Sequence, residues 1–418
     1  MDLINNTLKS SLNYIKTLIK WLVISAVVGI VGGVVGSVFH KSIDYATELR
    51  EEYRWLLFFL PLGGVVIASI YRLFRSKGKI DTNRVLEAVK TEEKVPVIMA
   101  PLIFVSTVIT HLLGGSAGRE GAALQLGGSL GYNIGRAFKL DKDDTHIIVM
   151  AGMSAVFAAL FGTPLTAAVF ALEVVTVGVI HYAALVPCII CAVSAFMVAL
   201  RFGISPVHFS SVAEQVLSVE LLLKVIVLCV LCALVSILFC TAIKKCEHLM
   251  KKFIPNVYLK AIVGGVIIVL LSLVLRTYDY NGAGMDVITK AIGGNANYEA
   301  FILKIIFTAI TISAGFKGGE IVPAFFVGST FGCVAGGLLG LDAGFSAAIG
   351  FVALFCGAVN CPLASVMLAI EVFGTNNLLP FAIACGISYM MSGYFGLYKS
   401  QKIAYSKLSY EEIDLNTK

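Results

Sequence analysis

The chain alternates long apolar segments with short polar ones along almost its whole length. Apolar runs with few charged residues cover 18–39, 56–70, 95–110, 146–172, 183–200, 225–243, 261–275, 305–314, 321–341, 345–370 and 378–393. Several approach the length of about 20 residues that a helix needs to cross the hydrocarbon core of a membrane, whereas others are shorter or contain glycines. The pattern predicts an all-α, polytopic membrane protein with broken helices that end near the membrane midplane.

Two segments of the first half return in the second half in the same order. The sequence S-A-G-R-E-G at 116–121 is echoed by S-A-G-F-K-G-G-E at 313–320, and Gly-Ser follows both glutamates at the same distance. The sequence P-L-T-A-A-V-F-A-L-E-V at 164–174 is echoed by P-L-A-S-V-M-L-A-I-E-V at 362–372. Such duplication in an apolar chain is typical of transporters built from two inverted-topology repeats, with the binding site between them.

The echoes and the apolar runs also divide the chain into segments. We expect a first membrane repeat at 18–200, a linker at 201–217 and a second membrane repeat at 218–398. The amphipathic residues 1–17 carry lysines and are expected to form a cytoplasmic surface helix. Residues 399–418 are expected to be a short cytoplasmic tail.

Composition fits a membrane protein, and the positions of the charges indicate its orientation. Hydrophobic residues make up 58% of the 418 residues, charged residues 14%, and the formal net charge is +6. The positive charges gather in segments 72–79, 244–252 and 399–407. By the positive-inside rule, these segments and both termini face the cytoplasm of a plasma-membrane protein. The excess charge therefore reflects topology, and nucleic acid is not an expected partner.

The cysteines and histidines give no sign of a metal site. Cys188/Cys191 and Cys229/Cys232 have C-x-x-C spacing, but both pairs lie in aliphatic runs without nearby histidine or carboxylate clusters. We expect neither a metal nor another cofactor. The sequence also shows no nucleophile–base constellation and no nucleotide-binding loop, so it does not indicate an enzyme.

The repeated glycine motifs form the candidate site. Gly118, Arg119 and Gly121 precede a predicted helix at 122–138, and Gly319 precedes a second one. A helix that begins at such a point presents unpaired N–H groups and the positive end of its dipole to an anion. Two such starts, brought together by repeat symmetry, would bind a small anion without a full positive charge and so allow rapid release. The alternative is that both motifs are ordinary glycine-rich packing segments.

Glu120 lies within the first motif, where a carboxylate should repel an anion. An ionisable group inside the membrane is costly and indicates a function. The conflict disappears if the carboxylate competes with the anion: ionised, it occupies the site, and protonated, it moves away and the anion enters. This exchange would link proton and anion movement. Glu320 has the matching position in the second repeat, whereas Glu173 and Glu371 end packed apolar helices near water and are interpreted as structural.

Residues 116–121 resemble the G-[KR]-E-G signature of the CLC chloride channels and anion/proton antiporters. The resemblance covers nearly the whole chain and includes the G-x-x-x-P segment at 319–323, the two P-L-x-x-x-x-x-A-[LI]-E segments and Tyr398. It implies an inverted-repeat helical fold and a homodimer in which each subunit has its own pore. About twenty residues follow Tyr398, so we expect this chain to lack the cytoplasmic nucleotide-binding pair of the family's large members.

The resemblance also implies roles for individual residues. Glu120 matches the external gating glutamate of the family. Ile321 and Val322 belong to the segment that binds the anion in the second repeat. Tyr398 matches the tyrosine whose hydroxyl borders the central anion.

The chain departs from the chloride-transporting pattern at several positions. Chloride-selective members have G-S-G-I-P before the segment that corresponds to 84–89, whereas this chain reads G-K-I-D-T-N at 78–83 and lacks the serine. The antiporters' internal proton-transfer glutamate would fall near Val174, which cannot carry a proton. Both absences, together with Glu320, resemble the bacterial fluoride/proton antiporter branch. That branch usually has threonine where this chain has Val322. We favour fluoride over chloride.

Two functions remain open from the sequence. In a proton-coupled antiporter, Glu120 and Glu320 would carry protons against the flow of fluoride or, as second candidate, chloride. In a passive, voltage- or pH-gated chloride channel, Glu120 would only be a gate. A scaffold without transport would leave the intramembrane carboxylates without a role. The expected partners are the halide, protons, membrane lipid and a second copy of the chain.

Overall fold

The protein is almost entirely helical in a computed structural model that describes residues 2–74, 82–91, 93–209 and 212–418. In chain order the helices are α1 (Asp2–Glu52), α2 (Leu60–Leu73), α3 (Thr82–Ala88), α4 (Met99–Leu112), α5 (Glu120–Ala137), α6 (Lys142–Phe161), α7 (Pro164–Glu173), α8 (Leu185–Arg201), α9 (Val219–Phe253), α10 (Val257–Leu275), α11 (Met285–Ile292), α12 (Ala300–Ala314), α13 (Ile321–Leu338), α14 (Ala343–Val359), α15 (Pro362–Phe373) and α16 (Leu378–Met391). Short 3-10 turns η1 (Arg54–Phe59) and η3 (Tyr182–Ala184) precede α2 and α8.

Helices of two lengths make up the membrane region. Seven helical segments of the described chain are long and apolar enough to cross a membrane: Ser11–Glu52, Arg54–Leu73, Lys142–Phe161, Tyr182–Arg201, Val219–Phe253, Val257–Leu275 and Ile321–Leu338. Six shorter apolar helices accompany them, namely α4, α7, α12, α14, α15 and α16. Short helices at matching places in the two halves are what broken, midplane-ending helices require. The predicted all-α, polytopic fold is confirmed.

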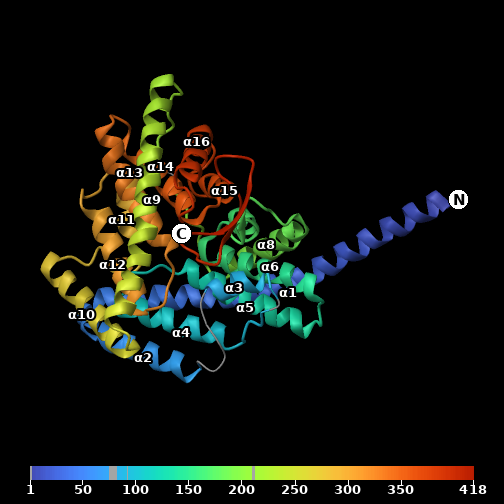
Figure 1. The fold of residues 1–418 in the computed structure, drawn as a ribbon, viewed down its shortest axis with the longest axis horizontal. Coiled ribbons are helices and arrows are strands. Elements are labelled where there is room, and N and C mark those ends of the chain that lie inside the picture. The colour runs from blue at the N-terminus through green and yellow to red at the C-terminus, as the bar shows by residue number, and fades with distance from the viewer. Residues whose placement is uncertain (1, 75–81, 92, 210–211) are drawn as a thin grey trace.

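The N-terminal helix α1 is one continuous element from Asp2 to Glu52. Its length of about 76 Å exceeds the thickness of a hydrocarbon core more than twofold. Its N-terminal part projects away from the body of the molecule (Figure 1). The residues expected to form a separate surface helix, 1–17, therefore share one helix with the first apolar span from residue 2 onward.

The two halves pack their central helices in the same way. Helix α5 lies along α6, and α13 lies along α14. A Cβ added to Gly152 of α6 would lie 2.3 Å from the Gly127 oxygen of α5, and one added to Gly350 of α14 would lie 2.1 Å from the Gly328 oxygen of α13. The backbones of the two helices in each pair are in direct contact, at positions where only glycine fits. Each glycine motif is therefore followed by a tightly packed helix pair.

Glutamates at the ends of two short helices join the repeats reciprocally. Glu371, near the end of α15, accepts hydrogen bonds from the N–H groups of Leu165 and Thr166 in the first turn of α7, at 2.9 and 2.8 Å. Glu173, at the end of α7, accepts bonds from two N–H groups in the first turn of α15, at 3.1 and 2.9 Å. Each carboxylate thus satisfies helix-start donors of the opposite repeat. These contacts agree with the structural interpretation of both residues.

A small sheet fastens the end of the chain to the first repeat. Strand β1 (Thr176–Val177) pairs in parallel with β2 (Lys402–Tyr405), which pairs antiparallel with β3 (Glu412–Asn416). The label of the C-terminus accordingly lies over the middle of the molecule in Figure 1. Two features of the sequence lie outside the described chain. One is the start of the G-K-I-D-T-N segment, residues 78–81, and the other is the group of basic residues Arg75, Lys77 and Lys79.

We predict that Glu371→Ala lowers the stability of the folded protein by about 2 kcal/mol, because hydrogen bonds to a charged acceptor are lost and helix-start donors stay buried. Thermal unfolding of the purified protein in detergent measures the change. Glu371→Gln retains an acceptor oxygen and should lose less. The anion-to-proton ratio of the folded fraction should stay that of the wild type. A variant of unchanged stability but altered ratio would contradict the structural role.

Candidate functional site

The two glycine motifs meet back to back between the repeats. The Gly118 N–H donates to the Gly319 carbonyl, and the Gly319 N–H donates to the Gly118 carbonyl, both at 2.7 Å. A Cβ on Gly319 would lie 2.4 Å from the Gly121 nitrogen, so the approach requires glycine. Helix α5 begins at Glu120 and α13 begins at Ile321, so both helix starts flank this antiparallel bridge.

The Glu120 carboxylate folds back over the start of its own helix. The residue is only 1% exposed, and its Oε2 accepts a hydrogen bond from the Arg119 N–H at 3.0 Å. A Cβ on Gly118 would lie 2.8 Å from the same oxygen. The carboxylate therefore uses a backbone donor that an anion at this helix start would need. This geometry is the one expected if ionised Glu120 competes with the anion.

The Arg119 side chain turns away from the bridge toward α1. Its Nη1 lies 2.7 Å from Asp44 Oδ1, and its Nε lies 3.8 Å from Glu120 Oε1. Asp44 Oδ2 is also 2.9 Å from His40 Nε2. Arg119 therefore contacts the glutamate through its backbone N–H and, at longer range, through its guanidinium, which also pairs with Asp44. The sequence motifs did not indicate the contacts of Asp44 and His40 with this site. The i,i+4 spacing of the two residues places them on one face of a helix.

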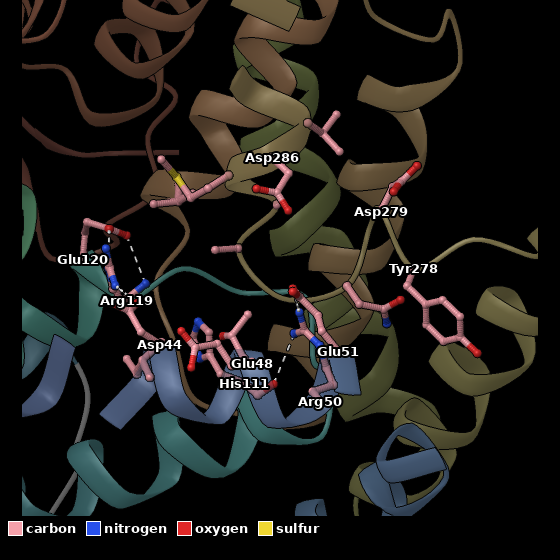
Figure 2. Close-up of a pocket in the computed structure, with 18 of the residues that line it drawn as sticks. Asp44, Glu48, Arg50, Glu51, His111, Arg119, Glu120, Tyr278, Asp279 and Asp286 are labelled. Carbon is pink, nitrogen blue, oxygen red and sulfur yellow. Dashed lines mark hydrogen bonds and ion pairs between the residues drawn. The ribbon is translucent and has the colours of Figure 1, made fainter. Parts of the chain in front are cut away.

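A cavity of about 530 Å³ opens on one side of the bridge, and we call it the Glu120 vestibule. Glu120, Arg119 and Val322 line it at the bridge. In Figure 2, Glu120 and Arg119 lie at one end and Tyr278 at the other. Five further carboxylates line this vestibule: Asp44, Glu48, Glu51, Asp279 and Asp286. The vestibule connects the gating candidate to a largely acidic surface.

A second cavity, of about 1000 Å³, is lined by Glu320, Tyr398 and Gln125, and we call it the Tyr398 vestibule. Glu120 and Glu320 therefore contribute to different cavities. Six lysines also line it: Lys90, Lys244, Lys251, Lys317, Lys399 and Lys402. Burial and the neighbouring Lys402 lower the pKa of Lys90 to about 8, so its charge is the one most sensitive to mildly alkaline pH. Three glutamates, Glu87, Glu247 and Glu320, line it as well, so the lysines leave the vestibule with an excess of positive charge, which favours anions.

Tyr398 presents an unsatisfied hydroxyl within this region. The residue is 3% exposed, and among the described residues its O–H has no hydrogen-bond partner. Tyr398 lines the same vestibule as Glu320. A buried hydroxyl without a partner is costly, so this group is available to a bound anion.

Three further residues complete the surroundings of the bridge. Ile321 and Val322 are buried, with 0% and 1% exposure, and form the first turn of α13. Gln125 was missed by sequence analysis, although it is a polar amide within the apolar helix α5. Its Nε2 donates to Thr82 Oγ1 at 2.8 Å, while its Oε1 has no partner among the described residues.

The described residues contain no group of three or more histidine, cysteine or acidic side chains arranged to hold a metal ion. All ten cysteines are free thiols, and most are buried.

Known proteins resemble this chain over most of its length. Residues 63–393 match the family described as voltage gated chloride channel. A chloride/fluoride channel protein of Pseudomonas syringae pv. tomato is 36% identical over 379 residues, which cover 88% of this chain and 83% of the relative. An H(+)/Cl(-) exchange transporter ClcA of Vibrio parahaemolyticus is 26% identical over 293 residues, covering 64% of this chain and 61% of the relative.

Solved structures share the same architecture. The crystal structure of a CLC-type fluoride/proton antiporter has a TM-score of 0.88 and 32% identity, covering 92% of this chain and 98% of that one. A slow cyanobacterial Cl-/H+ antiporter has a TM-score of 0.76 at 21% identity, covering 89% and 94%, and shares the fold. Together with the paired glycine motifs, these matches show that the chain belongs to the voltage-gated chloride channel (CLC) family of integral membrane transport proteins.

Proposed function

We propose that this protein is a proton-coupled anion antiporter that exports fluoride, with chloride as the second candidate ion. The observation that carries the proposal is the position of its two carboxylates. Glu120 and Glu320 lie at the two helix starts beside the Gly118–Gly319 bridge and face different vestibules. The fluoride named for the Pseudomonas syringae relative and for the antiporter structure gives independent support.

The exchange at Glu120 follows from its contacts. When ionised, the carboxylate holds the Arg119 N–H and fills the start of α5. When protonated, it loses the charge that favours this position near the helix dipole, so it moves into the Glu120 vestibule and an anion takes its place. One proton is therefore taken up or released for each opening of this path.

Glu320 supplies a titratable group on the other side of the bridge. Val174, which stands near the family's internal proton-transfer position, is fully buried and apolar. Among the described residues, which include all of α13, the Glu320 side chain makes no capping hydrogen bond to the first turn of this helix. A helix-capping role is thus less well supported than a proton relay between the Tyr398 vestibule and Glu120.

The distribution of charged residues supports an orientation of the protein in the membrane. The lysine-lined Tyr398 vestibule would face the cytoplasm together with both chain termini, and the Glu120 vestibule would face the outside of the cell membrane. Lysines at the cytoplasmic entrance would raise the local anion concentration before export.

We further propose a homodimer with one pore per subunit, in which large apolar side chains exposed on helices such as α1, α9 and α10 contact lipid or the second copy.

We predict that the protein transports fluoride at least about tenfold faster than chloride, a difference of about 1.4 kcal/mol in barrier height. Fluoride holds its hydration shell strongly, and closely spaced N–H and O–H donors are needed to replace it. Efflux from proteoliposomes loaded with equal concentrations of either ion, followed with ion-selective electrodes, measures the ratio. Robust chloride efflux with fluoride excluded would assign the chain to chloride instead.

Glu120→Gln imitates the protonated carboxylate, so proton movement should vanish while anion movement either persists or stalls. A pH electrode in the proteoliposome suspension measures the proton flux. Glu48→Gln is the matched control, because Glu48 lines the same vestibule but not the bridge. Proton pumping that survives Glu120→Gln unaltered would remove the assigned role.

Glu320→Gln should abolish proton-coupled fluoride transport in a protein that still folds, because the variant keeps the size of the side chain but cannot release a proton. Both fluxes are recorded in the same cell, and Glu87→Gln serves as a control from the same vestibule. If coupled transport in Glu320→Gln stays near the wild-type rate, Glu320 is structural and protons cross by another route, such as water.

A further inference from the structure

The chain segment after Tyr398 returns to hold the Tyr398 backbone. The Tyr398 carbonyl accepts a hydrogen bond from Thr417 Oγ1 at 2.6 Å and another from the Gln401 N–H at 3.0 Å. The Thr417 N–H in turn donates to the Gln401 carbonyl at 3.1 Å. Because Gln401 precedes β2 and Thr417 follows β3, the β2–β3 hairpin closes on the tyrosine.

Gln401 ties this hairpin to both membrane repeats. It is fully buried, and its Nε2 donates to the Val174 carbonyl at 3.0 Å and to the Val359 carbonyl at 2.8 Å. Val174 follows α7 of the first repeat, and Val359 ends α14 of the second. Its Oε1 accepts a bond from Asn360 Nδ2 at 3.2 Å. Both ends of the amide are therefore used, and a fully satisfied buried network of this kind is rigid.

Two further residues hold the same segment in place. Lys407 Nζ donates to Asn360 Oδ1, to the Tyr389 carbonyl at 2.8 Å and to Ser392 Oγ at 3.0 Å. Ser400 donates from its N–H to Asn83 Oδ1 at 3.1 Å. The backbone next to Tyr398 is thus held on one side by α14 and α16, and on the other by α3.

The Tyr398 side chain shows the opposite pattern, since its hydroxyl has no partner among the described residues. The hydroxyl is therefore positioned by the backbone and by the packing of the ring in the core, without a hydrogen bond of its own. We propose that residues 400–417 act as a clamp that sets the position of the Tyr398 hydroxyl toward the anion, with Thr417 and Gln401 as positioning residues. The inference rests on the proposed function, because it requires an anion that meets Tyr398.

Thr417→Val tests the clamp with little risk to folding, because the side chains have nearly the same shape and the Tyr398 carbonyl keeps its bond from Gln401. We expect the apparent KM for fluoride to rise about threefold to tenfold, the effect of one lost hydrogen bond. Thr417→Ser restores the hydroxyl and should restore the KM. Ser409→Ala is the control on the same hairpin, because the Ser409 hydroxyl donates to the exposed Glu411 carboxylate and does not line the vestibule.

A double-mutant cycle with Tyr398→Phe separates positioning from general support of the fold. If Thr417 acts through the tyrosine hydroxyl, Thr417→Val should raise the KM in the wild-type background and change little in Tyr398→Phe. Additive effects, a Thr417→Val protein with wild-type KM, or a Tyr398→Phe protein with wild-type KM would each overturn the clamp while leaving the proposed function intact. A wild-type protein that moves neither fluoride nor chloride would overturn both.

Discussion

The arrangement of the site depends on the pair of backbone hydrogen bonds between Gly118 and Gly319. This bridge brings the starts of α5 and α13 together from opposite repeats, at a distance that side chains would prevent. The antiparallel bridge joins the glycine motif of one repeat to that of the other. Every other feature of the site is arranged around it: a carboxylate beside each helix start, a vestibule on each side, and Tyr398 in the vestibule that Glu320 lines.

Three carboxylates of the structure, those of Glu120, Glu173 and Glu371, are accommodated by the same physical solution. Carboxylates inside the membrane region are placed at helix starts, where unpaired N–H groups and the helix dipole compensate the charge. Glu173 and Glu371 use such donors across the repeats and serve as fixed supports. Glu120 uses a donor at its own helix start, and an anion could take its place there. The proposed gate, Glu120, therefore differs from the two supports in that an anion could replace it at its backbone donor.

The sequence alone predicted much of this arrangement, because the echoes at 116–121 and 313–320 are local patterns. These echoes contain both glutamates, Glu120 and Glu320, and both bridging glycines, Gly118 and Gly319. The partners of Arg119 and of Tyr398 could not be predicted in the same way. Asp44 is far from Arg119 in the sequence, and Thr417 reaches Tyr398 only because the β2–β3 hairpin folds back. Such contacts depend on tertiary packing, which repeat and motif patterns do not encode.

The central claim is that anion and proton movements are coupled through the carboxylates at the bridge. Its most direct test uses wild-type protein in liposomes with a fluoride gradient and no initial pH gradient, recorded with a pH electrode. Coupled antiport predicts that protons move opposite to fluoride, build a pH gradient and continue against it after the membrane potential is clamped to zero. Fluoride flow that leaves the pH unchanged under the same clamp would contradict the account and identify a passive channel.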